Sequence, residues 1–201
     1  MSFRILVFYG SYRSDRMGIR LAQFLVEGLR ARISGDLGHD VELIDAKAIG
    51  LPMLDRMYKE YKPGEAPPAM AELAGKIRAA DGFVFVTGEY NWGMQPGLKN
   101  LTDHFLEEWF WRPAAIASYS AGRFSGARAA TAWHGTLSEM GMVVVSSTIA
   151  VGPIAQTLSV EGKPTGDGGK ALEHAFPRFA DDLLWWVEAA KEQRARKTPP
   201  Y

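Results

Sequence analysis

The stretch from Phe3 to Gly18 reads FRILVFYGSYRSDRMG and determines the fold class. An apolar run of strand length stops at Gly10, and a polar segment follows before helical periodicity begins at Ile19. The sequence therefore predicts a strand, a loop and a helix in succession. Such a loop presents unpaired backbone N–H groups and the positive end of the helix dipole, which together favour a bound anion.

The side chains of this loop suit a phosphate. Ser11 and Ser14 offer hydroxyl donors, and Arg13 and Arg16 can fork onto phosphate oxygens. They also follow a first strand, at the end where ligands bind in open α/β sheets. We therefore predict a phosphate site, with an ordinary helix start carrying two solvated arginines as the alternative.

Length and composition limit the class of protein. The chain has 201 residues, 47% of them apolar, so we expect residues 1–201 to form one domain with a full core. The 23 basic and 23 acidic residues balance, which leaves no general field for nucleic acid or anionic membrane. We expect the partner to be a small molecule or a second copy of the chain.

Cysteine is absent and only 4 histidines are present, without the spacing of metal ligands. These counts exclude a disulfide framework, a thiol nucleophile and an iron–sulfur cluster, and they predict no metal site. Redox chemistry would need a bound cofactor. No signal-peptide pattern and no apolar run of membrane-spanning length is present, so we expect a soluble, cytoplasmic protein.

Strand and helix patterns alternate along the rest of the chain. Further strands are predicted at 40–45, 83–88, 114–119 and 142–145. Helices are predicted at 17–33, ending near Gly35, at 69–79, from Pro96 through Phe105 and Glu108, at 127–140 and at 170–196. Residues 47–67 form a long connection of the kind that is usually functional or mobile, and we expect 191–200 to be a solvated tail.

Five strand–helix repeats predict a doubly wound α/β protein with helices on both faces of a parallel sheet. A phosphate loop after the first strand fits the flavodoxin-like five-stranded order 2-1-3-4-5 better than a dinucleotide domain. Neither G-x-G-x-x-G nor G-x-x-x-x-G-K-[ST] occurs, which argues against a dinucleotide fingerprint and a P-loop.

Four segments resemble motifs of one family. Residues 10–18 resemble a G-S-x-R-x-x-R-x-G phosphate loop, and 89–100 resemble a P-E-Y-N…P-G-x-L-K-N signature. Residues 118–122 resemble S-Y-G-G more weakly, and 51–55 resemble L-P-x-x-D. The chain thereby resembles the NADPH-dependent FMN reductase family, flavodoxin-like enzymes that include quinone, azo and chromate reductases.

The resemblance implies FMN, with its phosphate in the first loop and its ring between the loops after the third and fourth strands. Backbone groups from Glu89 to Gly93 would contact the pyrimidine edge and N5 of the ring. No catalytic side chain is implied, because the cofactor supplies the chemistry. The implied cofactor-binding residues are Ser11, Arg13, Arg16, Met17, Gly18, Glu89, Tyr90, Asn91, Trp92, Gly93, Ser118, Ser120 and Gly122.

Two features depart from the family pattern. Gly88 stands where the family has proline, and Trp92 begins a run that replaces a shorter, serine-containing one. Gly88 predicts a different shape of the loop over the flavin, because glycine allows dihedral angles that proline forbids. The bulk of Trp92 predicts altered access for the substrate. Taken alone, Glu89 to Asn91 could form a plain turn, and residues 153–201 match the family poorly.

The resemblance implies an NAD(P)H oxidoreductase that passes electrons to a quinone, azo compound, metal oxyanion or free flavin. We expect a ping-pong mechanism, because only one planar cleft is expected between the two ring loops. A flavodoxin-type electron carrier and a non-catalytic interaction protein are the alternatives. The aromatic residues Trp109, Phe110, Trp111, Trp185 and Trp186 are expected in the core or at a subunit contact rather than in a cofactor cage. With the 47–67 connection, the 105–111 cluster predicts a homodimer or homotetramer in which a neighbour completes the active site.

Overall fold

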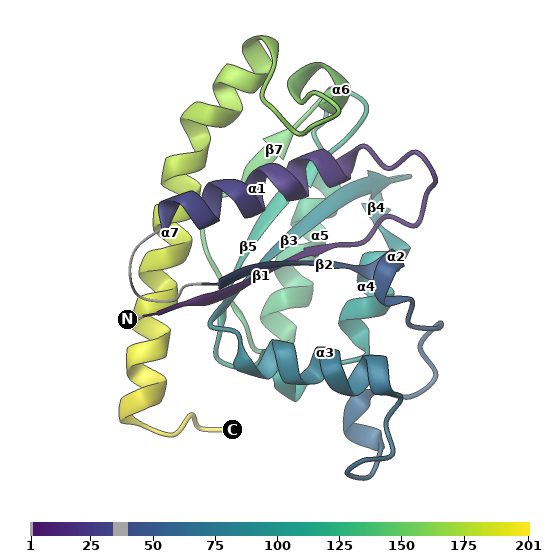
Figure 1. Ribbon diagram of the computed structural model, residues 1–201, viewed down its shortest axis with the longest axis vertical. Helices are drawn as coiled ribbons and strands as arrows, with labels where there is room; N and C mark the ends of the chain where they lie inside the picture. The colour runs from purple at the N-terminus through teal and green to yellow at the C-terminus, as the bar shows by residue number, and fades with distance from the viewer. Residues whose placement is uncertain (1, 34–39) are drawn as a thin grey trace.

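The computed structural model describes residues 2–33 and 40–201, and the predicted helix end near Gly35 lies outside them. Its main sheet is parallel, with the strand order β2-β1-β3-β5-β6 (Figure 1). The strands are β1 (Arg4–Tyr9), β2 (Asp40–Asp45), β3 (Gly82–Tyr90), β4 (Gly93–Met94), β5 (Pro113–Tyr119), β6 (Val143–Val144) and β7 (Ile149–Val151). The predicted order is confirmed, since the labels shift only because the short β4 intervenes.

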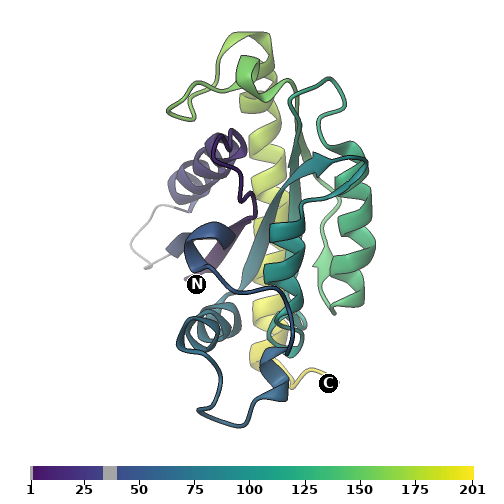
Figure 2. The same ribbon diagram turned by 90° about the vertical axis from the view of Figure 1, so that its right-hand side faces the viewer.

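Helices cover both faces of this sheet, as Figure 2 shows for α1 and α5 on opposite sides of the strands. The longer helices are α1 (Gly18–Arg32), α3 (Pro68–Ala79), α4 (Pro96–Asp103), α5 (Ala127–Glu139) and α7 (Gly166–Arg196). The short ones are α2 (Ala46–Ile49), α6 (Ile154–Thr157) and the 3-10 turns η1 (Tyr58–Glu60) and η2 (Glu107–Trp109). No helix in the described ranges is both long and apolar enough to cross a bilayer.

Alternation along the strands builds two cores. In β1, Ile5 and Val7 face the core beneath α1 and α7, whereas Leu6 and Phe8 face the core beneath α3, α4 and α5. All four side chains are fully buried. The continuous apolar runs in the sequence arise because both faces of each central strand are covered.

Trp109 belongs to the second core. It is fully buried and packs edge-on against Phe8 and Phe83, with ring centroids 5.2 and 5.0 Å away. Its indole N–H donates to the Phe105 carbonyl at 3.1 Å. The core, one of the two places expected for Trp109, is therefore confirmed, and neither Phe105 nor Trp109 has exposed surface that could support the predicted subunit contact.

Two predicted boundaries are also wrong. The helix that begins at Pro96 ends at Asp103 rather than continuing through Glu108, and η2 then turns the chain so that Trp109 enters the core. The fifth strand is shared by two short segments, because β6 pairs with the start of β5 and β7 with its end. The sequence prediction contained only the first of these segments.

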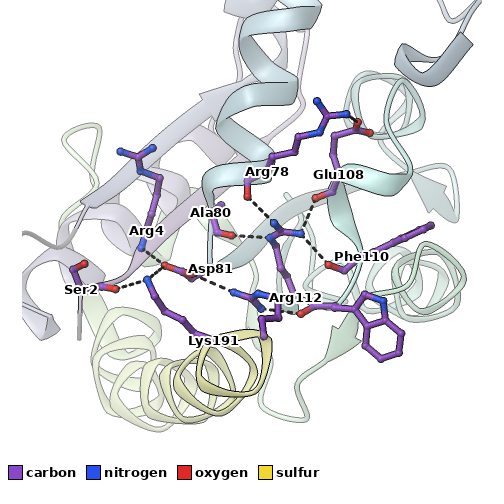
Figure 3. Close-up of polar contacts among 11 residues, drawn as sticks. Ser2, Arg4, Arg78, Ala80, Asp81, Glu108, Phe110, Arg112 and Lys191 are labelled. Atoms are coloured by element: carbon purple, nitrogen blue, oxygen red, sulfur yellow. Dashed lines mark hydrogen bonds and ion pairs between the residues drawn. The ribbon is translucent and has the colours of Figure 1, made fainter. Parts of the chain in front are cut away.

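The amino ends of the strands are fastened by buried charges (Figure 3). Asp81 accepts hydrogen bonds from the Arg4 backbone, Lys191 and Arg194 at 3.1, 2.7 and 3.2 Å. The Arg112 guanidinium donates to four backbone carbonyls, and burial lowers its pKa to about 10. The prediction of a solvated tail from residue 191 is wrong, because Asp81 ties the end of α7 to the sheet.

Candidate functional site

Three loops meet at the opposite edge of the sheet, where the parallel strands end. They follow β1, β3 and β5, and they enclose a cavity of about 190 Å³. Its lining contains seven of the predicted binding residues: Ser11, Arg13, Arg16, Met17, Glu89, Tyr90 and Ser120. Asp15, Gly88, Tyr119, Ala121 and Ile154 complete it.

The first loop presents donors to this cavity. Ser11 is buried, and its hydroxyl shares a hydrogen bond of 3.0 Å with the Tyr90 hydroxyl, which joins the loops after β1 and β3. Arg13 is exposed, and its guanidinium has no ion-pair partner among residues 2–33 and 40–201. Met17 precedes the first residue of α1, so the positive end of the helix dipole lies at the cavity.

Arg16 differs from Arg13 in being already paired. Its Nη1 lies 2.6 and 2.7 Å from the two carboxylate oxygens of Asp45, at the end of β2. The guanidinium also lies 5.8 Å from the centre of the Tyr9 ring. The two arginines are thus not equivalent, because Arg13 is free for an incoming anion and Arg16 would share its charge between that anion and Asp45.

Close packing around Tyr119 requires two glycines. A Cβ on Gly18 would lie 2.0 Å from the Tyr119 ring, and one on Gly88 would lie 2.9 Å from the same ring and 2.7 Å from Gln95. Real Cβ atoms do not approach so closely, so any larger residue would push α1 or β3 away. Gly18 therefore sets the position of α1 against Tyr119, and Gly88 forms part of the cavity wall.

Buried hydroxyl groups lie behind the cavity. The Tyr119 hydroxyl accepts a hydrogen bond of 2.8 Å from the Gln95 amide, whose carbonyl oxygen has no partner in the described part of the chain. Burial raises the pKa of Tyr119 and of Tyr9, so both phenols stay protonated at neutral pH. The predicted site contains Tyr90 but omits Tyr119, although the resemblance to S-Y-G-G includes that position.

The segment after β3 forms a hairpin, where a loop is predicted. Strand β4 pairs antiparallel with the end of β3, and the two residues between them have positive φ, 48° at Asn91 and 75° at Trp92. Such values are typical of a tight two-residue hairpin turn. Glu89 and Tyr90 line the cavity, whereas Asn91, Trp92 and Gly93 lie beyond it at the tip.

The loop after β5 is shaped by serine hydroxyls. Ser118 is buried and donates to the Ser125 carbonyl at 2.7 Å, and Ser120 donates to the Gly122 carbonyl at the same distance. Ser120 faces the cavity, whereas Ser118 and Gly122 hold the loop in shape. Direct contact of all thirteen predicted residues with a ligand stays a prediction.

A second, more apolar cavity of about 540 Å³ adjoins the first, since Arg13 and Tyr90 line both. Its walls include Tyr12, Leu51 and Met53. The 51–54 segment is fastened to α4 by Asn100, whose side chain accepts from the Leu54 N–H and donates to the Pro52 carbonyl, both at 2.8 Å. This contact links the L-P-x-x-D resemblance to the asparagine of P-G-x-L-K-N.

The donors of the first cavity fit a phosphate monoester. A free guanidinium, a second one shared with Asp45, the Ser11 hydroxyl and the start of α1 converge there. In the described ranges no three His, Cys, Asp or Glu side chains are grouped closely enough to hold a metal ion. Fold and site therefore define a flavodoxin-like α/β protein whose loop after the first strand carries donors suited to an anion.

Comparison with known proteins identifies the family within this class. Residues 3–156 match the family model for NADPH-dependent FMN reductase, and the chain belongs to that family. It is 30% identical over 202 residues to an NAD(P)H-dependent FMN reductase of Nectria sp, covering 94% of this chain and 96% of that protein. A quinone reductase of Pseudomonas putida is 28% identical over 193 residues, covering 92% and 95%.

Among solved structures, the flavoenzyme NAD(P)H:(acceptor) oxidoreductase FerB of Paracoccus denitrificans is similar in fold. Its TM-score is 0.74 at 22% identity, over 94% of this chain and 98% of that one. The alignment extends well beyond the part that matches the family model. The flavodoxin-like fold predicted from the sequence is confirmed.

Proposed function

We propose that the protein is an FMN-dependent NAD(P)H oxidoreductase that passes electrons to a small-molecule acceptor. The observation that carries the proposal is the cavity itself, where the exposed Arg13, which has no ion-pair partner in the part of the chain that the structure describes, and the start of α1 meet the loops after β3 and β5. Family membership supports FMN as the cofactor and NADPH as the reductant. The class of acceptor is a quinone, azo compound, metal oxyanion or free flavin.

Bound FMN would supply the hydride chemistry, and the chain's own residues bind and orient. Arg13, Ser11 and the N–H groups before α1 would hold the phosphate, with Arg16 contributing part of its charge. Glu89, Tyr90 and Ser120 would border the ring, and Tyr119 would hold the cavity wall in place. Asn91, Trp92, Gly93, Ser118 and Gly122 would act through the shape of the two loops.

A ping-pong order follows if NAD(P)H and the acceptor use one planar site in turn. Initial rates with NADPH and a quinone should then give parallel double-reciprocal lines. Intersecting lines, together with a demonstrated ternary complex, would contradict the order. An electron carrier would show no steady NADPH oxidation, which also separates the enzyme from the main alternative.

We also propose a homodimer or homotetramer in which a neighbour completes the site. With Trp109 assigned to the core, the support comes from the second cavity instead. Met53 is 80% exposed and Tyr12 is 44% exposed at its edge, directly beside Arg13 and Tyr90. Apolar side chains so placed suit burial by a second copy of the chain.

A further inference from the structure

Four side chains form a ladder of rings and guanidinium groups beside the cavity. The Arg128 guanidinium lies 4.2 Å from the centre of the Trp92 ring and 4.4 Å from that of Phe124. Arg123 lies 4.9 Å from the Phe124 ring. We call Trp92, Arg128, Phe124 and Arg123 the rim ladder.

Glu89 holds the rim ladder in place through its contacts with Arg128. One carboxylate oxygen of Glu89 lies 3.0 Å from Arg128 Nε, and the other accepts the Arg128 backbone N–H at 3.1 Å. Glu89 is almost buried, and Arg128 is partly buried. The guanidinium is therefore fixed at the start of α5 and supports both rings, although both rings lie at the surface.

Three members of the rim ladder, Trp92, Phe124 and Arg123, have side chains exposed to solvent. Trp92 is 72% exposed and Phe124 is 54% exposed, and neither belongs to a core cluster. Arg123 is exposed, and no carboxylate pairs with it within residues 2–33 and 40–201. The positive φ of Trp92 is uncommon for a bulky residue, so the hairpin presents this ring in a strained conformation.

The position of the ladder ties it to the active-site cavity. Glu89 and Tyr90 line the cavity two or three residues before Trp92, and Ser120 and Ala121 line it shortly before Arg123 and Phe124. The same two segments thus form the cavity and then meet outside it at Arg128. The ladder therefore lies on the two segments that also border the cavity.

We propose that the rim ladder binds the part of a substrate that is both aromatic and anionic. A flat ring would stack on the exposed faces of Trp92 and Phe124, and its negative group would pair with Arg123. The role in turnover rests on the proposed oxidoreductase function, but the binding itself does not. Two sources share this chemistry: the adenosine 2′-phosphate end of NADPH, and an acceptor whose ring carries a sulfonate or carboxylate.

Calorimetric titration with naphthalene-2-sulfonate and with neutral 2-naphthol tests the site directly. The protein should bind the sulfonate several-fold more tightly than the naphthol. Arg123→Gln should weaken sulfonate binding about three- to tenfold and leave naphthol binding unchanged, which is the range of an exposed ion pair with a hydrogen bond. Phe124→Leu should weaken both, and Arg178→Gln, an exposed arginine on α7, should change neither.

Kinetics then assign the source. If NADPH is the ligand, Arg123→Gln raises KM for NADPH but not for NADH, and adenosine 2′-phosphate displaces the sulfonate. If the acceptor is the ligand, KM rises for a sulfonated quinone but not for benzoquinone. Equal affinity for sulfonate and naphthol, or equal effects of Arg123→Gln and Arg178→Gln, would overturn the proposal.

A different outcome would also overturn it. If the ladder is covered by a second copy, the probes do not bind and Arg123→Glu lowers the mass measured by light scattering. Flavin content and NADH oxidation with benzoquinone report separately on the proposed function. Sulfonate binding by a protein that holds no flavin would reject that function and leave the site in place.

Discussion

Replacing Arg13 or Arg16 should weaken FMN binding much more than riboflavin binding. The two ligands share the ring and differ at the phosphate, so the comparison isolates the anion site. Arg13 has no ion pair to lose among the described residues, and its removal takes away only contacts to the ligand. A charge-assisted hydrogen bond contributes about 1.5–3 kcal/mol, which is roughly ten- to hundredfold in Kd.

Arg16→Ala should show a smaller FMN effect and a second one on stability. Its guanidinium already pairs with the partly buried Asp45 at 2.6 Å, so the phosphate would receive only part of its interaction. The variant also leaves Asp45 without this partner, and we expect unfolding to become easier by about 1 kcal/mol. Arg13→Ala should leave the unfolding free energy unchanged within about 0.5 kcal/mol.

Fluorescence titration of the stripped protein with FMN and riboflavin measures these affinities. Arg13→Lys keeps the positive charge but loses the paired N–H donors of the guanidinium, so it separates these two contributions to phosphate binding. Arg178→Ala removes an exposed charge from α7 and controls for general electrostatics. If Arg13→Ala and Arg16→Ala bind FMN as the parent does, the phosphate lies elsewhere and the assigned site is wrong.

Three further predictions concern packing, pH and assembly. Trp109→Ala should lower the unfolding free energy by about 3–5 kcal/mol, because the side chain is fully buried. Trp185 is 63% exposed, so Trp185→Ala should change the unfolding free energy by less than about 0.5 kcal/mol. Equal denaturation midpoints of the two variants would contradict the assignment of Trp109 to the core. Burial raises the pKa of Tyr119 above its ordinary value of 10.0, so the unfolded chain releases the phenolic proton at a lower pH than the folded chain does. The contribution of Tyr119 to the free energy of unfolding is therefore fully present below pH 10 and decreases above it by about 1.4 kcal/mol per pH unit. Tyr119→Phe should reduce the slope of the unfolding free energy against pH, and an unchanged slope would refute this. Met53→Glu should reduce both mass by light scattering and turnover without altering the thermal midpoint of the monomer, and a fully active parent monomer would exclude the shared site.

The first strand, loop and helix could be predicted because each has a strong local signal. The apolar run of β1 is continuous where both faces are covered, and the periodicity of α1 begins immediately after the loop. The strand order could be predicted because connections between parallel strands are right-handed, which leaves few possible topologies whatever the side chains are. The loops around the cavity followed from their place at strand ends.

The features that the sequence did not predict depend on contacts between residues far apart in the chain. The turn at Asn91 and Trp92 lacks the glycine that normally marks such hairpins, and the Trp92 ring is supported by Arg128 from α5. Strand β7 has only three residues, too few for alternation to be visible. The pairing of Arg16 with Asp45 joins the first loop to the end of β2, and no spacing in the sequence indicates it.

If the cavity holds FMN that NAD(P)H can reduce, the visible spectrum of the bound flavin must respond to NADPH. The purified protein, incubated with FMN and freed of excess by gel filtration, is examined by visible absorption before and after anaerobic addition of NADPH. We expect a yellow protein with the absorption bands of bound flavin, which bleach on addition of NADPH and return when a quinone is added. A colourless protein, or flavin bands that NADPH leaves unchanged, would show that the cavity does not hold a flavin reducible by NADPH.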